Sequence, residues 1–456
     1  MTTTDILPYL APGRRAHLVG IGGVSMAPLA EVLHGMGMVI TGSDMRQSAT
    51  VDHLRTLGIP VIVGQNAENL GDAELVIRTA AAHDNNPEIA RAHTRGIPVF
   101  ERAQAWGAIM KSYENALCIA GTHGKTTTTS MCTHIFLAAR RDPTVMIGGT
   151  LPMLGAGHRV GKGDTIIAES CEYCNSFLSF SPTVAVILNV EADHLDFFKD
   201  LDDIKHSFRQ FAQLVPPSGS VIVNEDNEGA RSIACGLDPF TFGLSDSAEC
   251  TVANLTWDKG LPTFDITVHG EQYAHVSLRV GGVHNVSNAL AAASAAWVLG
   301  VPGAAVEEGL NAFTGAGRRF EKKGTVNGAD VYDDYAHHPD ELRALLTMAK
   351  TLGYRRIVCA FQPHTYSRTK ALFDRFVEVL SQPDVTLLAE IFAAREVNEL
   401  GISSKDLCEK IPGSEYFATL KALTARLREI TRPGDLILTV GAGDIYTVGE
   451  ALVNGE

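Results

Sequence analysis

The stretch Leu117-Cys-Ile-Ala-Gly121-Thr-His-Gly-Lys125-Thr-Thr-Thr128 decides how this chain folds and what it can bind. Residues 117–120 are apolar and predict a buried strand, and residues 129–139 have the pattern of a helix. Glycines allow the intervening backbone to turn its N–H groups inward, and the start of the helix adds the positive end of its dipole. The turn is therefore predicted to cradle phosphate, with the Lys125 side chain on the β- and γ-phosphates and the Thr126 hydroxyl on Mg²⁺.

This loop is a shortened variant of the general phosphate-binding pattern, because Ile119 stands where that pattern has a glycine. The alternative interpretation is an ordinary tight turn between a strand and a helix. The strand before the turn and the adjacent Lys-Thr pair favour phosphate binding.

Two residues that could hold a metal ion follow later strands of the same block. Glu172 comes just after the expected strand 165–169, and His194 follows the expected strand 184–188 in the sequence Glu191-Ala-Asp-His194. Ligands of an α/β sheet gather at the carboxyl ends of its strands. Because Mg²⁺ prefers oxygen, Glu172 is the expected ligand and His194 the less typical one.

Glu172 also lies inside a Cys-x-x-Cys sequence formed by Cys171 and Cys174. A zinc site would need a second pair, and no other two of the eight cysteines lie close in sequence. A redox dithiol would need the start of a helix in a thioredoxin-like unit. We therefore expect neither a metal nor a redox role for these cysteines.

Short apolar runs rich in β-branched residues alternate with helical patterns, which predicts an α/β fold with mainly parallel sheets. The runs form three blocks, and we expect domains over residues 1–112, 113–316 and 317–456. Between residues 263 and 280 the pattern changes to alternating apolar and polar residues around Gly270, which predicts added antiparallel strands.

Composition and charge narrow the class of protein. Hydrophobic residues make up 45% and charged residues 20% of the 456 residues, so a disordered chain is not expected. The net charge of −14 repels polyphosphate backbones and no basic stripe is visible, so nucleic acid is not an expected partner.

The sequence also bears on location. Residues 1–12 have neither a basic segment nor an apolar core, so no signal peptide is expected. The apolar stretch 289–306 is rich in alanine and contains Gly300, Pro302 and Gly303, which predicts a buried helix, a turn and a second helix rather than a membrane span. Sparse, scattered cysteines fit a reducing compartment, and the expected location is the cytoplasm.

A second glycine-rich turn, Gly20-Ile-Gly22-Gly23, follows the first expected strand. Asp44 lies twenty-four residues after Gly20, close to where a dinucleotide-binding fold places the acid that holds a ribose hydroxyl. Ser25 replaces the third glycine of that pattern. A nicotinamide dinucleotide and another diphosphate, such as a UDP-sugar, both satisfy these residues.

Taken in order, the motifs resemble those of the Mur ligases, the ATP-dependent amide-forming enzymes of peptidoglycan precursor synthesis. The resemblance covers essentially the whole chain. Besides the two glycine-rich turns and Glu191-Ala-Asp-His194, it rests on Gly42-Ser-Asp44, Gly282-Val-His-Asn-Val-Ser-Asn288, Gly317-Arg-Arg-Phe-Glu321, Tyr332-Asp-Asp-Tyr-Ala-His-His-Pro339 and Phe361-Gln-Pro-His-Thr-Tyr-Ser-Arg-Thr369. It implies a Rossmann-like amino-terminal domain, a central P-loop ATPase-like domain and a Rossmann-like carboxyl-terminal domain.

The resemblance also implies roles for individual residues. The UDP-substrate site would contain Gly20, Gly22, Gly23, Ser43, Asp44 and His194. The ATP site would contain Gly121, Thr122, His123, Gly124, Lys125, Thr126, Thr127, His284, Asn285, Asn288, Arg319 and Asp334. Tyr335, His337 and Arg368 would bind the amino acid, and Thr126, Glu172 and His194 would hold Mg²⁺. Lys125, Glu172, His194, Arg319 and His337 would serve catalysis.

The activity that the resemblance implies is the joining of L-alanine to the lactyl carboxylate of UDP-N-acetylmuramate through an acyl phosphate, with the third domain closing over nucleotide and amino acid. The alternative within the family reattaches a recycled murein tripeptide to the same acceptor. Outside the family, a nicotinamide dehydrogenase would have no use for the phosphate loop. A UDP-sugar sensor would not need the complete set of catalytic residues, which here is Lys125, Thr126, Glu172 and His194. The expected partners are the small-molecule substrates, and no insertion of the protein into a membrane is expected. The oligomeric state could be a monomer or a homodimer.

Two positions depart from the family pattern. Many members have Asp-Glu-Ser-Asp where this chain has Cys171-Glu-Tyr-Cys174, although the central glutamate is kept. Many have arginine where Thr365 stands, which leaves Arg368 to contact the amino-acid carboxylate.

Overall fold

A computed structural model describes residues 5–195, 197–394 and 396–455, so residues 1–4 of the stretch analysed for a signal peptide lie outside the described part. The chain divides into two compact units. The first runs up to Leu255 and adds Phe264–Val276 and His284–Phe313. The second contains Thr256–Thr263, Ser277–Val283 and the chain from Thr314 onward.

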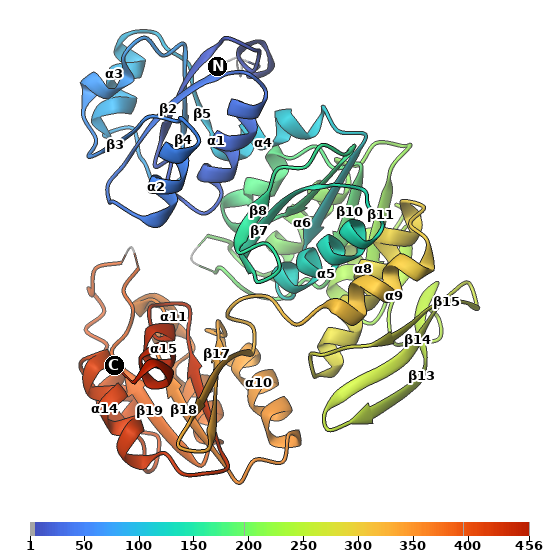
Figure 1. Ribbon diagram of the computed structural model, residues 1–456, viewed down its shortest axis with the longest axis vertical. Helices are drawn as coiled ribbons and strands as arrows, with labels where there is room; N and C mark the ends of the chain where they lie inside the picture. Colours follow the sequence, from blue (N-terminus) through green and yellow to red (C-terminus); the bar gives the residue numbers. More distant parts are fainter. Residues whose placement is uncertain (1–4, 196, 395, 456) are drawn as a thin grey trace. The chain divides into compact units, whose positions relative to one another are not determined.

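The first sheet of unit one is parallel throughout, in the order β3-β2-β1-β4-β5 (Figure 1). Parallel strands need long crossovers, and helices supply most of them here. The strands are β1 (Arg15–Val19), β2 (Val39–Asp44), β3 (Val61–Val63), β4 (Leu75–Arg78) and β5 (Val99–Glu101), and the helices are α1 (Met26–Gly35), α2 (Ala49–Thr56), α3 (Pro87–Thr94) and α4 (Arg102–Met110).

The second sheet has the order β15-β14-β13-β12-β11-β10-β6-β9-β7-β8. Its β6 strand lies between β10 and β9 and runs parallel to both. Two-residue turns join β13, β14 and β15, so these strands reverse direction at each turn. The strands are β6 (Asn115–Ala120), β7 (Thr144–Leu151), β8 (Ala156–Arg159), β9 (Thr165–Glu169), β10 (Val184–Ile187), β11 (Ser220–Asn224), β12 (Phe240–Phe242), β13 (Cys250–Asp258), β14 (Leu261–Val268) and β15 (Glu271–Ser277).

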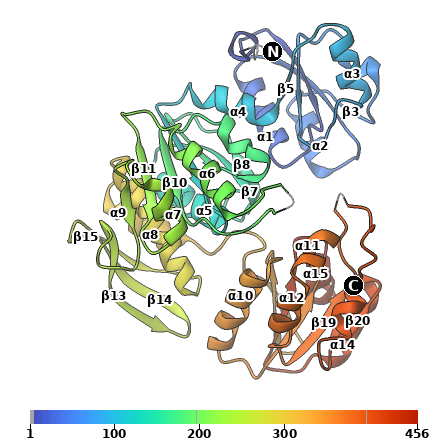
Figure 2. The same cartoon turned by 180° about the vertical axis from the view of Figure 1, so that it is seen from behind.

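Helices cover both faces of this second sheet. Figure 1 shows α5 (Lys125–Ala138), α8 (Val283–Val298) and α9 (Gly303–Ala312) on one side, and Figure 2 shows α6 (Leu201–Ala212) and α7 (Glu228–Ala234) on the other. The contact between α5 and α9 is close, since a Cβ at Gly309 would lie 2.6 Å from the backbone of Ile135. Burial on both faces explains why the central strands are continuous apolar runs.

The second unit carries the third sheet, in the order β16-β17-β21-β18-β19-β20. Only the β16–β17 pair is antiparallel. The strands are β16 (Glu321–Val326), β17 (Ala329–Asp334), β18 (Arg356–Phe361), β19 (Val385–Ala389), β20 (Glu415–Phe417) and β21 (Asp435–Val440), and the helices are α10 (Pro339–Thr351), α11 (Tyr366–Ala371), α12 (Phe373–Leu380), α13 (Ser404–Cys408), α14 (Leu420–Ile430) and α15 (Tyr446–Asn454).

The expected fold class is confirmed: three α/β domains with mainly parallel sheets and added antiparallel strands. The stretch 289–306 is a helix, a turn and a second helix, as predicted. Helix α5 begins at Lys125, four residues before the expected start, because the threonines after the glycine turn are already helical. Within the described ranges, no helix is both long and apolar enough to span a membrane. The domain boundaries remain predictions.

Candidate functional site

The phosphate loop joins the buried strand β6 to α5 through a turn that only glycine can make at two positions. Gly124 is the N-cap of α5 with a φ of 85°, and a Cβ there would lie 2.7 Å from the side-chain oxygen of Asn288. Gly121 has a φ of 153°, and its Cβ would lie 2.9 Å from the Leu188 side chain. The backbone therefore passes close to β10 and α8 and opens toward the helix start.

The loop is held in place by the segment that follows β10. The side chain of Asn189 accepts from the N–H of His123 at 2.7 Å and donates to its carbonyl at 3.1 Å. The N–H of Glu191 donates to the Thr122 hydroxyl at 2.9 Å. These bonds fix the turn, so the predicted residues Thr122 and His123 shape the loop.

Lys125 begins α5, and its ammonium group lies inside the turn. It donates to the carbonyls of Gly121 and Thr122, and its Nζ is 3.0 Å from Oε2 of Glu172. Burial disfavours the charged form, but the Glu172 carboxylate outweighs it and raises the pKa of Lys125. The lysine is therefore a permanent cation at the position expected for the terminal phosphates.

The hydroxyl of Thr126 donates to Oε1 of Glu169 at 2.9 Å. Glu169 is the last residue of β9, and its other oxygen accepts from the N–H of Gly148 at 2.6 Å. Sequence reasoning missed Glu169 and considered only Glu172, although an acid at the end of the strand beside β6 was a readable signal. Thr127 and Thr128 follow in the first turn of α5.

His194 lies beside Glu172. Its Nε2 is 3.8 Å from Oε1 of Glu172 and 3.9 Å from Oδ2 of Asp193, and its ring centroid is 4.8 Å from that of Tyr173. No three His, Cys, Asp or Glu side chains of the described residues gather as a ready-made metal site. Of the three predicted metal ligands, Glu172 and His194 lie close together, whereas the hydroxyl of Thr126 bonds to Glu169 and not to Glu172.

Asn288 buttresses the phosphate loop from α8. Its side-chain oxygen accepts from the Thr128 hydroxyl at 3.2 Å, and its amide group donates to Asn285 at 3.2 Å. Both asparagines lie within α8, whereas His284 is exposed in the first turn of that helix. The adenine-side role of these three residues stays a prediction.

The first glycine turn is anchored on the end of β2. The N–H groups of Gly20 and Ile21 donate to the carbonyl of Ser43 at 2.8 and 3.0 Å. The N–H of Gly22 donates to Oδ2 of Asp44 at 2.9 Å. Asp44 is therefore at the turn, as predicted.

The Ser43 hydroxyl does not face the turn. It is buried and donates to Glu88 at 2.6 Å, and Glu88 also accepts from Asn69 at 2.6 Å. Alternation along the strand explains this, because neighbouring side chains point to opposite faces. The part of Ser43 that contacts the glycine turn is its carbonyl, with Gly23 completing the turn through its bond to Gly20.

In the second unit, Asp334 ends β17 with a buried carboxylate. It accepts from the N–H groups of Phe320 at 2.7 Å and Ala336 at 2.8 Å. Burial raises the pKa of Asp334 to about 6, and Arg319 opposes part of this rise. Arg319 lies over the ring of Tyr335 at 5.3 Å, so these predicted residues share one cluster.

Arg318 is not a surface arginine. Its Nε is 2.9 Å from the buried carboxylate of Asp333, and it donates to the carbonyls of Gly441 and Gly443. It also lies over Tyr335 and Tyr446 at 5.0 and 4.7 Å. Arg318 therefore fixes the segment that carries Arg319.

The predicted amino-acid residues also lie together in this unit. His337 is 5.6 Å from Tyr335 and 5.8 Å from His364, measured between ring centroids. Arg368 contacts His364 with 3.2 Å between Nη1 and Nδ1. Burial lowers the pKa of His337, with Glu341 opposing and Arg368 reinforcing the effect.

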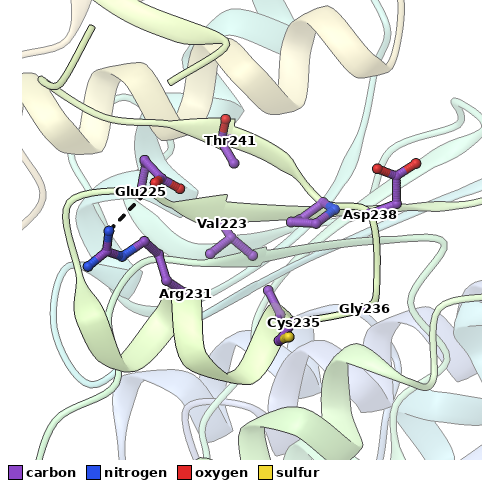
Figure 3. Close-up of a pocket in the computed structure, with 9 residues that line it drawn as sticks. Val223, Glu225, Arg231, Cys235, Gly236, Asp238 and Thr241 are labelled. Atoms are coloured by element: carbon purple, nitrogen blue, oxygen red, sulfur yellow. Dashed lines mark ion pairs between the residues drawn. The ribbon is translucent and has the colours of Figure 1, made fainter. Parts of the chain in front are cut away.

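A separate cavity of about 490 Å³ opens beside α7 and β12 (Figure 3). Glu225 and Arg231 face each other at its edge, with 3.7 Å between the charged atoms. None of the residues that line it is a predicted site residue.

Comparison with known proteins gives a consistent result along the chain. Residues 15–114 match the Mur ligase family catalytic domain, residues 119–296 the Mur ligase middle domain, and residues 318–443 the Mur ligase glutamate ligase domain. A UDP-N-acetylmuramate--L-alanine ligase of Lachnospira eligens is 48% identical over 447 residues, which are 96% of this chain and 97% of that protein. The corresponding protein of Agathobacter rectalis is 46% identical over 445 residues, covering 96% and 97% of the two chains.

Solved structures agree. The crystal structure of UDP-N-acetylmuramate-alanine ligase MurC from Thermotoga maritima superposes with a TM-score of 0.82 at 29% identity, covering 97% of this chain and 98% of that one. A murein peptide ligase from Psychrobacter arcticus has a TM-score of 0.72 at 24% identity over 97% and 98% of the two chains, which shows a shared fold. With matches of this extent at both the sequence and the structural level, this chain belongs to the Mur ligase family.

Proposed function

We propose that this protein joins L-alanine to the lactyl carboxylate of UDP-N-acetylmuramate at the expense of ATP, in peptidoglycan precursor synthesis. One observation carries the proposal: Lys125, Thr126 and Glu172 gather on the phosphate loop. It is supported by two relatives named UDP-N-acetylmuramate--L-alanine ligase, which are 46% and 48% identical to this chain over nearly their whole length. The cytoplasm is the proposed location, in keeping with the scattered free cysteines.

We propose that each of the three sheets belongs to a domain with its own binding role. Residues 1–112 bind the UDP part of the acceptor at the first glycine turn, residues 113–316 bind ATP, and residues 317–456 supply contacts to nucleotide and amino acid. The intact hydrogen-bond anchoring of both glycine turns supports the first two assignments. The cluster of Tyr335, His337 and Arg368 supports the third.

The first chemical step is activation of the carboxylate. An oxygen of the lactyl carboxylate attacks the γ-phosphorus of ATP, the bond to the β-phosphate oxygen breaks, and ADP leaves with an acyl phosphate formed. No enzyme nucleophile is needed, so positioning and neutralisation of charge carry this step. The Lys125 ammonium stabilises charge on the transferring group, and Arg319 is proposed to do so from the second unit.

Mg²⁺ would neutralise phosphate charge and orient the transferring group when bound. It is usually held by one or two carboxylates together with substrate phosphates. Glu172, the Thr126 hydroxyl and Glu169 fit this mode, since they provide oxygen ligands without a closed cluster of three acids. His194, close to Glu172, is proposed to act on the acceptor side.

The second step forms the amide. The neutral amine of alanine attacks the acyl carbon, and the tetrahedral intermediate expels inorganic phosphate. The ammonium form must first lose a proton, and His337 is a candidate acceptor because burial lowers its pKa and keeps the imidazole neutral near pH 7. Arg368 is proposed to bind the alanine carboxylate.

The decisive experiment measures phosphate release and identifies the product by mass. We expect release only when ATP, UDP-N-acetylmuramate and L-alanine are all present. If free L-alanine is inert and the L-alanyl-γ-D-glutamyl tripeptide is accepted, the recycling activity replaces this proposal. If phosphate is released without an amide product, the sensor hypothesis gains support instead.

A further inference from the structure

Within unit one, a hydrogen bond joins a helix of the first sheet to a strand of the second sheet. Glu31 lies in the middle of α1, and His158 lies in β8, the edge strand of the second sheet. Nε2 of His158 is 2.9 Å from Oε1 of Glu31. Because an ionised carboxylate only accepts, Nε2 carries the proton and donates it. The two side chains are 17% and 14% exposed, so little water competes for this contact.

His158 stands in one row with residues that lead toward the phosphate loop. It pairs with Met146 of β7, and Met146 in turn pairs with Ala168 of β9. Neighbouring strands lie about 4.8 Å apart, so His158 is about 10 Å from the residue that precedes Glu169. The hairpin of β7 and β8 therefore carries the Glu31 contact on its outer strand, while its inner strand lies against β9.

The inner strand of this hairpin also contacts Glu169 directly. The N–H of Gly148 donates to Oε2 of Glu169 at 2.6 Å, and the other oxygen of Glu169 accepts from the Thr126 hydroxyl at 2.9 Å. A Cβ at Gly148 would lie 2.7 Å from Oε1 of Glu169, so a side chain at this position would collide with the carboxylate. A shift of the hairpin would therefore disturb Glu169 and, through it, Thr126.

Apolar packing between the two sheets accompanies the polar contact. Met146 and Ala168 belong to the same buried cluster as Leu29 of α1 and Trp106 of α4. Apolar burial is non-directional, whereas a hydrogen bond depends on both distance and angle. The bond between Glu31 and His158 therefore selects one alignment of α1 with the hairpin among those that the apolar surfaces allow.

We propose that Glu31 and His158 are positioning residues that align the first sheet with the phosphate loop. The inference rests on the proposed function, in which residues 1–112 bind the acceptor and residues 113–316 bind ATP. Transfer of the γ-phosphate needs the two reacting atoms about 3–3.5 Å apart, and a misplacement of about 1 Å can cost roughly a hundredfold in rate. The pair acts at a distance from these atoms, through α1 on one side and through the hairpin that contacts Glu169 on the other.

The test separates substrate binding from chemistry. In His158→Ala and in Glu31→Ala we expect kcat to fall about tenfold, while the KM values for ATP, UDP-N-acetylmuramate and L-alanine stay within about threefold. Rapid-quench measurement of the ADP formed in the first turnover, without L-alanine, should show the same loss, because formation of the acyl phosphate depends on the alignment. His158→Gln keeps a side-chain donor and should return kcat to within about threefold of the native value.

A double-mutant cycle tests whether the two residues act as a pair. The double alanine variant should be no slower than the slower single variant, because either substitution removes the same hydrogen bond. If one single variant does not fold, the other carries the kinetic test for the same reason.

His53→Ala is the matched control. His53 is 53% exposed, and its Nε2 lies 3.3 Å from the same oxygen of Glu31, but it comes from α2, a helix of the first sheet. Its loss leaves the contact with the hairpin in place, so kcat should stay within about twofold of the native value.

Three results would overturn the inference. An unchanged first-turnover rate in both alanine variants would show that the alignment does not depend on this bond. Multiplied losses in the double variant would show that the residues act separately, and a rise in the KM for ATP as large as the loss in kcat would mean that the hairpin only supports the phosphate loop. A native protein that forms no amide from UDP-N-acetylmuramate, L-alanine and ATP would instead overturn the proposed function itself.

Discussion

The ammonium nitrogen of Lys125 lies 3.0 Å from a carboxylate oxygen of Glu172, and Glu172 is only 2% exposed. The two residues come from neighbouring strand ends of one sheet, β6 and β9. Their pairing neutralises two charges that would each be costly to bury alone. If the proposed site is correct, a nucleotide that enters the loop would compete with Glu172 for the lysine and would release the carboxylate to bind Mg²⁺.

Replacing Lys125 with alanine should abolish amide formation. The ammonium group lies inside the phosphate loop, and its loss should remove several kcal/mol of transition-state stabilisation, or roughly a thousandfold in rate. Coupled phosphate release measures the effect, and Lys111→Ala, at an exposed position, is the control. Near-normal turnover in Lys125→Ala would refute the role assigned to the lysine.

Replacing Glu172 with glutamine should weaken the dependence on Mg²⁺. The amide keeps the shape of the side chain but lacks the negative charge that a hard cation needs. We expect the Mg²⁺ concentration for half-maximal rate to rise about tenfold, on the scale of the loss that follows removal of metal-site partners. A magnesium titration at saturating substrates measures this, and an unchanged midpoint would assign the metal to Glu169.

Replacing Asp44 with alanine should raise the KM for UDP-N-acetylmuramate with little change in kcat. Asp44 accepts from the N–H of Gly22 and holds the first glycine turn, where the UDP part of the substrate is proposed to bind rather than react. The expected rise is about tenfold, as for the loss of one charged hydrogen bond. Steady-state kinetics at saturating ATP and alanine checks it, and an unaltered KM would move the UDP site away from this turn.

Replacing Cys171 with serine should leave activity within about twofold of the native value, because surface substitutions outside special features have small effects. Cys171 and Cys174 are exposed, and among the described residues no group of three metal-binding side chains forms a site. Activity assays with and without reductant or added zinc provide the measurement. A tenfold loss would revive the metal or redox interpretation.

The stability of the second unit should depend on the protonation of Asp334. Its pKa is raised from 3.8 to about 6 in the folded protein, so between these values the fold keeps a proton that the unfolded chain has released. Stability contributed by the protonated group is therefore full below pH 3.8 and lost as the pH rises through 6. Integrated over this window, the loss is about 3 kcal/mol.

Asp334→Asn should remove this dependence, because its amide does not ionise. The native protein should lose about 3 kcal/mol relative to the variant between pH 4 and pH 7. Denaturant-dependent hydrogen exchange of β17 and β21 reports this unit separately, and the exposed Asp374→Asn is the control. A pH-independent difference would mean that Asp334 is ionised throughout.

The phosphate loop shows which structural features can be predicted from neighbouring residues alone. Glycine at 121 and 124, an apolar run before them and Lys-Thr after them are enough to predict a strand, a turn and a helix, since backbone conformation is chosen by neighbouring residues. The antiparallel strands around Gly270 and the paired helices on either side of Gly300 were predictable for the same reason. Several strands were not predicted, among them the short strand β12 and the edge strand β8, because neither of these has a distinctive pattern.

The partners of individual side chains, in contrast, could not be predicted from the sequence. Glu169 and Glu172 are three residues apart, and no local pattern tells which one bonds Thr126 and which one pairs with Lys125. The Ser43 hydroxyl faces Glu88, and Arg102 reaches Ser25 across many residues of chain, because packing brings distant segments together. Sequence alone thus indicated the family and the two glycine-rich turns that are proposed to bind phosphate, while the fold chose which charges meet, since pairing depends on contacts between residues far apart along the chain.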